Sequence, residues 1–178
     1  ITTHNYTPPP LIPVVEVVPG ERTNPAVVET TCALLRHIGK EPVVCKEVPG
    51  HIGVRLTTAL RREAYYIVEK GYATPETVDT VLRSVARLLP VIGAFAMTDF
   101  SGVDVLRDVH RNIQPHLDHR PEPSPLLEKM IAEGKLGVKS GEGFYRWSPE
   151  QVKEMFAARG EELVRWMRKD SPAPPPPD

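Results

Sequence analysis

The segment PVVEVV, residues 13–18, restricts the fold more than any other part of the sequence. Four valines in six residues are typical of a strand whose two faces are both covered. Pro13 before the run and Pro19-Gly20 after it mark the ends of regular structure. Glu16 lies in the middle, where a carboxylate is costly unless it is protonated or meets a hydrogen-bond donor. We therefore predict a strand here and a partner for Glu16.

A strand, a helix and a further strand are predicted around this segment. Residues 1–6 (ITTHNY) and 41–48 (EPVVCKEV) are typical of short strands. Residues 23–39 predict a helix, with Thr23 or Asn24 as its cap, a proline in its first turn and a glycine after its end. This order and spacing indicate the last part of an α/β sheet.

The pattern changes after Pro49-Gly50, where apolar residues recur at helical spacing. Pro90 is expected to stop one of these helices, and Ser148 with Gln151 predicts a capping box at the start of the last one. The expected helices cover residues 51–71, 74–90, 101–117, 124–134 and 148–170. We expect a mainly α protein, with domains at 1–48 and 49–169 and a disordered proline-rich tail at 170–178.

Composition excludes several classes of partner. The 178 residues carry a net charge of −1, so no basic field favours nucleic acid or anionic lipid. No apolar run approaches the roughly 20 residues needed to cross a bilayer.

The two cysteines form no disulfide or metal pattern, and we expect a reducing, cytoplasmic location. Because the chain begins within a strand-like stretch and without Met, we expect it to be part of a larger protein.

His4 is the candidate partner of Glu16. The intervening loop, NYTPPPLIP, is long enough to return the chain beside the first strand. A carboxylate on one imidazole nitrogen fixes the tautomer and raises the basicity of the other nitrogen, as a general base at neutral pH requires. By itself this spacing is a weak signal, because many strand pairs place a histidine near a glutamate.

Other candidates are weaker. HLDHR, with His116, Asp118 and His119, has no second ligand cluster, so we predict a solvated loop and no metal site. GEGFY, residues 141–145, neither follows a strand nor opens a helix, so it is not a dinucleotide-binding loop.

Five segments, in order, resemble the second half of the NAD-dependent 3-hydroxyacyl-CoA dehydrogenase family, which is related to L-gulonate dehydrogenase (lambda-crystallin). The similarity runs from about residue 2 to about residue 147 and ends on a specific motif. The segments are THNYTPPPLIPVVEVVPG, GKEPVVCKEVPGHIGVRL, EAYYIVEKGYATPETVDTVL, DFSGVDVL and KLGVKSGEGFYRW.

This resemblance implies the last strands and helix of a Rossmann NAD-binding domain, followed by a helical carboxy-terminal domain that forms a homodimer. It implies hydride transfer between NAD and a 3-hydroxyacyl-CoA, with His4 as the catalytic base and Glu16 as the carboxylate that orients it. Lys139 matches a lysine that reaches the cofactor. The nicotinamide cofactor would be bound mainly by an amino-terminal half, so we expect the isolated chain to be inactive.

Two positions depart from the family pattern. Thr7 stands where the family often has an asparagine near the cofactor, and its hydroxyl can still make a polar contact. Val54, in PGHIGVRL, stands where an asparagine contacts the reacting oxygen, and valine has no donor. Val54 and His51 are therefore candidate substrate-binding residues. Two alternatives follow: the substrate is a hydroxy acid without CoA, or the chain is a non-catalytic dimerisation or substrate-binding module.

Overall fold

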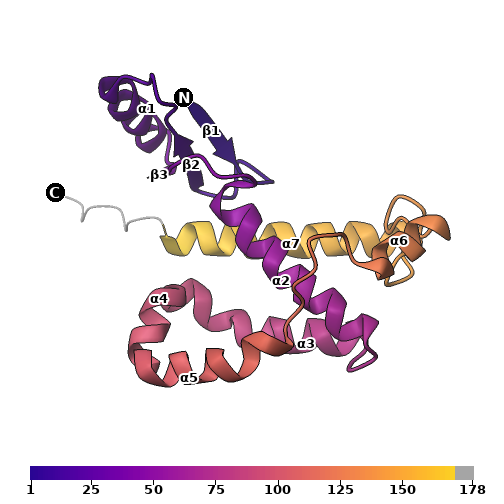
Figure 1. Ribbon diagram of the computed structural model, residues 1–178. Helices are drawn as coiled ribbons and strands as arrows, with labels where there is room; N and C mark the ends of the chain where they lie inside the picture. The colour runs from indigo at the N-terminus through magenta and orange to yellow at the C-terminus, as the bar shows by residue number, and fades with distance from the viewer. Residues whose placement is uncertain (171–178) are drawn as a thin grey trace. The chain divides into compact units, whose positions relative to one another are not determined.

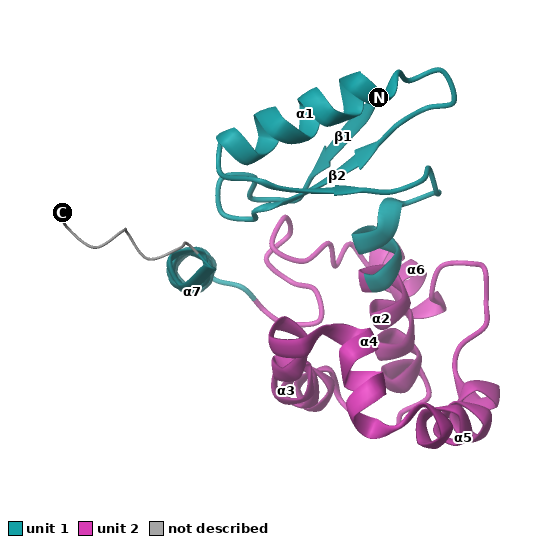
Figure 2. Cartoon of the chain, turned by 90° about the vertical axis from the view of Figure 1, so that its left-hand side faces the viewer, with its two compact units in different colours: residues 1–56, 147–178 teal, residues 57–146 magenta. Residues whose placement is uncertain are grey.

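The computed structural model describes residues 1–170. The tail was predicted at residues 170–178; Asp170 is the last residue of a helix, and the rest of the predicted tail lies outside the described residues. The chain divides into two compact units (Figure 2). The first contains residues 1–56 and the segment from residue 147 onward, and the second contains residues 57–146. The predicted class is confirmed, since a small sheet near the amino terminus is followed by helices (Figure 1).

The sheet of the first unit has three strands, β1 (Thr2–Asn5), β2 (Val14–Val18) and β3 (Glu41–Val44), in that spatial order. β2 pairs antiparallel with β1 and parallel with β3. The third strand is shorter than predicted, although the Cys45 N–H still donates to the Val17 carbonyl at 3.0 Å. In the β1–β2 register His4 lies directly opposite Glu16, which places the two candidate residues side by side.

Helix α1 (Pro25–His37) connects β2 to β3. Of the two predicted caps, Thr23 and Asn24, it is Asn24 that caps the helix, accepting a hydrogen bond from the Ala26 N–H at 2.9 Å. The core of the unit consists of Val15, Val17, Val18 and Cys32, all buried. Glu16 is also buried, with 2% of its surface exposed, so the predicted cost of its position is real.

Helix α2 (His51–Glu69) begins in the first unit and continues into the second. The second unit adds four further helices and two short 3₁₀ turns within residues 57–146, and the long helix α7 follows in the first unit. These elements are α3 (Pro75–Val85), η1 (Ala86–Leu88), α4 (Leu89–Ser101), α5 (Val103–Ile113), η2 (Gln114–His116), α6 (Pro125–Ala132) and α7 (Pro149–Asp170). The capping box at the start of α7 is confirmed by two reciprocal bonds between Ser148 and Gln151, at 2.9 and 3.2 Å.

Helix α4 was not predicted, and Pro90 does not stop a helix. Helix α3 ends earlier, at Val85, and Pro90 lies in the first turn of α4. A proline is tolerated there because the first N–H groups of a helix have no intrahelical acceptor. Gly93 interrupts α4 with φ 69° and ψ 172°, a conformation that glycine adopts without a steric penalty.

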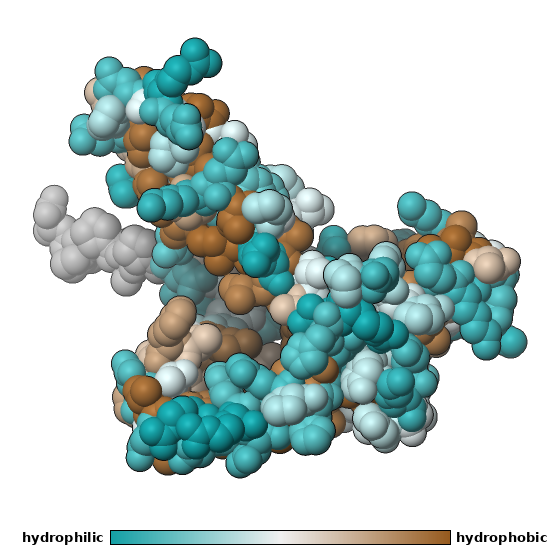
Figure 3. Space-filling model, viewed as in Figure 1, coloured by the Kyte–Doolittle hydropathy of each residue, from teal (hydrophilic) through white to brown (hydrophobic). Residues whose placement is uncertain are grey.

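Apolar side chains reach the surface of the second unit (Figure 3). Phe95 and Phe100 of α4 are 90% and 86% exposed, and helices α2 to α6 contain no buried residue. The stretch Pro75–Ser101 has 27 residues and contains an 18-residue window with a mean hydropathy of 1.5, so by length and composition it could cross a membrane, contrary to our sequence estimate. Its break at Gly93 would leave backbone groups unpaired in lipid.

Candidate active site

His4 and Glu16 form a direct pair in the first unit. The Nδ1 atom of His4 lies 2.8 Å from Oε2 of Glu16, across the antiparallel strands. The His4 side chain keeps 27% of its surface exposed, whereas the Glu16 side chain keeps 3%. A buried carboxylate thus holds one edge of an imidazole whose other edge remains accessible.

Glu16 receives further donors from the first turn of α2. Its Oε1 accepts from the N–H groups of Ile52 at 2.8 Å and Gly53 at 3.1 Å. Burial alone would raise the pKa of Glu16, but hydrogen bonds from His4, Tyr6 and these two N–H groups outweigh burial and lower it to about 2. The positive end of the helix dipole favours the same charge. Glu16 is therefore an ionised acceptor at neutral pH.

Tyr6 and Gly53 belong to the site, although the sequence analysis did not select them. The Tyr6 ring meets the His4 ring edge-on at 4.7 Å, and its hydroxyl accepts from the Gly53 N–H at 3.0 Å. Burial, and a hydrogen bond to the charged Glu16, raise the pKa of Tyr6 to about 12, so it stays a neutral donor. The sequence did contain a signal for Tyr6, because it lies two residues after His4 and residues two apart on an extended segment share a face.

His51 packs directly against His4. The two imidazole rings are stacked, with centroids 4.5 Å apart and planes 14° from parallel. His51 has φ 51°, an uncommon conformation for a residue other than glycine, and it opens α2 directly after Gly50. Its Nδ1 atom is buried and has no hydrogen-bond partner in the described part of the chain. The structure thus brings together three of the six predicted residues: His4, Glu16 and His51.

These three side chains each place one ligand atom within 4.8 Å of the others, a distance that would suit a metal ion. The chemistry argues against one. Lone pairs of imidazole nitrogens lie in the ring planes, and two nearly parallel stacked rings do not direct them to one point. The oxygens of Glu16 already accept from His4, Ile52 and Gly53. The donor set suits an acid–base group better than a cation site.

The remaining predicted residues are more exposed. Thr7 lies just after β1 and precedes Pro8 through a cis peptide bond. Val54, in the first turn of α2, is 40% exposed and directly follows Gly53. Lys139 belongs to the second unit, in an exposed turn that the bridge between Gly137 and Glu142 closes. Their roles stay predictions.

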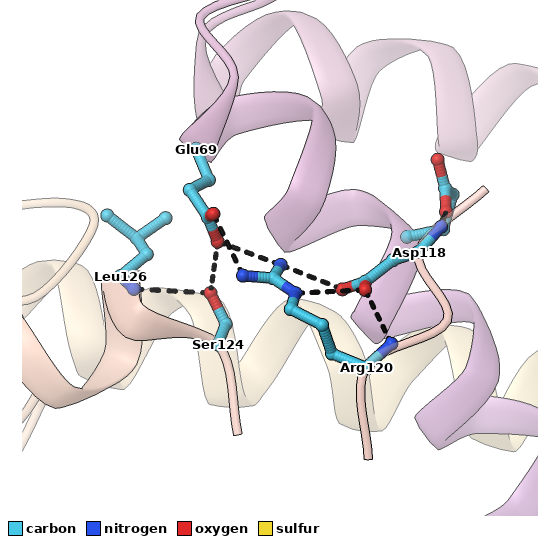
Figure 4. Close-up of polar contacts among 6 residues, drawn as sticks. Glu69, Asp118, Arg120, Ser124 and Leu126 are labelled. Atoms are coloured by element: carbon cyan, nitrogen blue, oxygen red, sulfur yellow. Dashed lines mark hydrogen bonds and ion pairs between the residues drawn. The ribbon is translucent and has the colours of Figure 1, made fainter. Parts of the chain in front are cut away.

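A second polar cluster lies wholly within the second unit (Figure 4). Arg120 donates to both oxygens of Glu69, at 2.9 and 3.0 Å, and to Asp118 at 2.8 and 2.9 Å. Hydrogen bonds from Arg120 lower the pKa of Asp118 to about 2. Asp118 is buried, so the prediction of a solvated loop was wrong at this residue. Because Arg120 occupies its carboxylate, we interpret the cluster as an anchor for residues 117–125 and not as a metal site.

Comparison with known families covers nearly all of the first 147 residues. Residues 50–147, more than half of the chain, match the family described as 3-hydroxyacyl-CoA dehydrogenase, C-terminal domain. Residues 1–48 match the family described as 3-hydroxyacyl-CoA dehydrogenase, NAD binding domain.

Two curated relatives illustrate the range of the match. The chain is 39% identical over 163 residues to 5-formyl-3-hydroxy-2-methylpyridine 4-carboxylate 5-dehydrogenase of Mesorhizobium japonicum, covering 90% of this chain and 53% of that protein. It is 34% identical over 146 residues to the mitochondrial hydroxyacyl-coenzyme A dehydrogenase of Sus scrofa, covering 81% of this chain and 46% of that protein. The chain therefore spans about half the length of these relatives.

A solved structure of a relative has a fold similar to that of this chain. The crystal structure of the 5-dehydrogenase for the pyridine 4-carboxylic acid, described as an NAD⁺-dependent dismutase, is 38% identical to this chain, with a TM-score of 0.88. The match covers 93% of this chain and 54% of that one.

Proposed function

This chain belongs to the 3-hydroxyacyl-CoA dehydrogenase family, and on that basis we propose that it is the catalytic and substrate-binding part of an NAD-dependent oxidoreductase. The reaction is the interconversion of a carbon that bears a hydroxyl group, in an alcohol or an aldehyde hydrate, and the corresponding carbonyl group, with His4 as general base. The observation that carries the proposal is the 2.8 Å contact between His4 and a buried, ionised Glu16.

We propose a task for each side chain. With Glu16 ionised, His4 carries its proton on Nδ1 and donates it to Oε2, which leaves the lone pair of Nε2 free to accept the substrate's hydroxyl proton. The carboxylate then stabilises the imidazolium that forms. The N–H groups of Ile52 and Gly53 hold the carboxylate in place, so it needs little reorganisation during the reaction.

The described residues fit only part of an NAD site. The two strand-to-helix connections of the sheet, residues 19–24 and 45–50, contain one glycine each, so neither forms the glycine-rich phosphate cradle of a dinucleotide fold. Thr7 and Lys139 are the residues that we propose contact the cofactor. When bound, NAD supplies the hydride acceptor. We propose activity for a protein in which the rest of an NAD-binding domain is joined to, or assembled with, this chain; calorimetry should detect no micromolar NAD binding to the chain alone.

Two classes of substrate are candidates. A 3-hydroxyacyl-CoA agrees with the family to which the chain belongs. A carboxylate substrate without CoA is the second candidate, and two observations favour it. Val54 offers no side-chain donor, and a relative that is 39% identical is named for a pyridine 4-carboxylate.

Variants of the paired residues test the proposal in the full-length protein. His4→Ala should abolish turnover while the circular dichroism spectrum remains unchanged, and Glu16→Gln should lower turnover less severely. His37→Ala, a change at an exposed histidine of α1, is the matched control and should leave the rate unchanged. A near-wild-type rate for His4→Ala would exclude the base assignment and favour a non-catalytic module.

A substrate panel separates the two candidates. Nicotinamide absorbance would be followed with 3-hydroxybutyryl-CoA, with free 3-hydroxybutyrate and with the pyridine carboxylate named above. Val54→Asn should raise the rate on 3-hydroxybutyryl-CoA if the thioester is the substrate. No gain with that thioester, together with turnover of a free acid, would favour the second candidate.

We further propose a cytoplasmic homodimer that forms through the helical unit. Exposed phenylalanines on α4 and the absence of buried residues in α2 to α6 leave a large apolar surface to be covered. Phe95→Glu should convert a dimer to a monomer in sedimentation experiments. Leu34→Glu, at a 60% exposed position of α1, is the control and should leave the dimer intact.

A further inference from the structure

His51 combines three features that its position at the start of a helix does not explain. Its ring stacks on the ring of the proposed base at 4.5 Å. Its backbone has φ 51°, which a residue with a side chain adopts only when its surroundings enforce it. Its Nδ1 atom is buried without a hydrogen-bond partner among the described residues.

The buried nitrogen decides which atom of His51 carries the proton. A proton on Nδ1 would create a buried N–H donor with no acceptor, and such orphaned donors are rare in folded proteins. A bare Nδ1 leaves an unpaired acceptor instead, which folded proteins tolerate more often than an unpaired N–H donor. The ring as a whole is only partly buried, so the accessible nitrogen is Nε2, and it carries the hydrogen.

The two stacked rings therefore have opposite hydrogen-bonding character. Glu16 holds the proton of His4 on Nδ1 and leaves its Nε2 as an acceptor. His51 offers Nε2–H as a donor. A hydroxyl group bound beside the stack can donate its hydrogen to His4 and accept a hydrogen bond on its oxygen from His51.

Building on the proposed function, we propose that His51 is a catalytic residue that donates a hydrogen bond to the substrate's reacting oxygen. During oxidation the O–H bond breaks and its proton passes to Nε2 of His4. When NAD is bound, the C–H bond would break with its electron pair going to the nicotinamide, so the hydroxyl-bearing carbon would be oxidised to a carbonyl group and NAD would be reduced. The hydrogen bond from His51 stabilises the negative charge that develops on the oxygen, which the side chain of Val54 cannot do.

The tautomer can be measured without any turnover. Nitrogen-15 spectra of the histidine-labelled full-length protein, assigned by comparison with His51→Phe, should show a neutral His51 ring protonated on Nε2 at pH 8. A ring protonated on Nδ1 would overturn the inference, whatever the activity of the enzyme.

The activity test removes the donor and keeps the stack. His51→Phe preserves an aromatic ring against His4 but lacks the N–H, so kcat should fall about 10²-fold, with a smaller change in KM. His51→Gln keeps an N–H donor without the ring and should retain more activity than His51→Phe. The panel substrates 3-hydroxybutyryl-CoA, free 3-hydroxybutyrate and the pyridine carboxylate are the probes, and melting temperatures confirm that each variant folds.

A double variant provides the decisive comparison. Val54 lies three residues after His51 in the same helical turn, so Val54→Asn brings an amide donor to the same face. In the His51→Phe background it should recover part of the lost kcat. Full activity of His51→Phe alongside an inactive His4→Ala would refute this inference and leave the proposed function standing, whereas an active His4→Ala would refute the proposed function itself.

Discussion

Gly53→Ala should disturb the candidate site without changing any side chain that performs chemistry. A Cβ at residue 53 would lie 2.2 Å from the Tyr6 hydroxyl oxygen and 2.6 Å from the ring carbon that bears it. Both distances are far below normal contact, so the Tyr6 ring must swing away. The movement breaks the 3.0 Å bond from the Gly53 N–H and withdraws the tyrosine's hydrogen bond from Glu16.

The lost bonds set the size of the effect, since the ring can move to relieve the clash itself. A neutral hydrogen bond contributes about 1 kcal/mol and one to a charged group about 2 kcal/mol. Alanine in place of glycine within a helix returns about 1 kcal/mol. The unfolding free energy should therefore drop by about 2 kcal/mol. With one donor gone, the pKa of Glu16 should rise from about 2 by about one unit or more.

Carbon-13 NMR titration of the glutamate carboxyls and urea denaturation measure the two quantities. Gly160→Ala is the matched control, because a Cβ there meets nothing within 4 Å. It should stabilise the protein slightly and leave the Glu16 titration unchanged. If Gly53→Ala were as stable as the wild type with Glu16 still titrating near pH 2, the described contact between Tyr6, Gly53 and Glu16 would be wrong.

Two further predictions concern stability. The pKa of Glu16 is about 2 in the folded chain and 4.5 as its ordinary value, so its stabilising effect is present above pH 4.5 and is lost as the pH falls towards 2. Over that range the wild type should lose about 3 kcal/mol more unfolding free energy than Glu16→Gln, as measured by urea denaturation at a series of pH values. Parallel pH dependences of the two proteins would contradict this. Arg120→Met leaves the carboxylates of Glu69 and Asp118 without their partner and should lower the melting temperature by several degrees. Arg111→Met removes an exposed ion pair and should leave the melting temperature unchanged. Equal melting temperatures for the two variants would count against the anchor role of Arg120.

The sequence was informative where local rules apply. The valine run predicted β2, and Asn24 and Pro25 predicted the start of α1. The pairing of His4 with Glu16 followed from a buried carboxylate that needed a donor across neighbouring strands. Each of these inferences depends on residues that are close in sequence or joined by one short connection.

What could not be predicted depends on longer-range contacts. Leu89-Pro90 has the composition of a helix end, and only the structure shows that a new helix begins there. Gly53 enters the site because α2 begins close to β2, 37 residues away in sequence from Glu16. Asp118 is buried through Arg120 and the end of α2, which no spacing within HLDHR could indicate.

The exposed apolar surface of the second unit has a consequence for how the protein behaves on dilution. When the cover for an apolar surface comes from a second molecule, mass action ties folding to concentration. Melting curves recorded at nanomolar and at millimolar protein would then not superimpose. For such a molecule, a single melting temperature is a property of the sample as much as of the sequence.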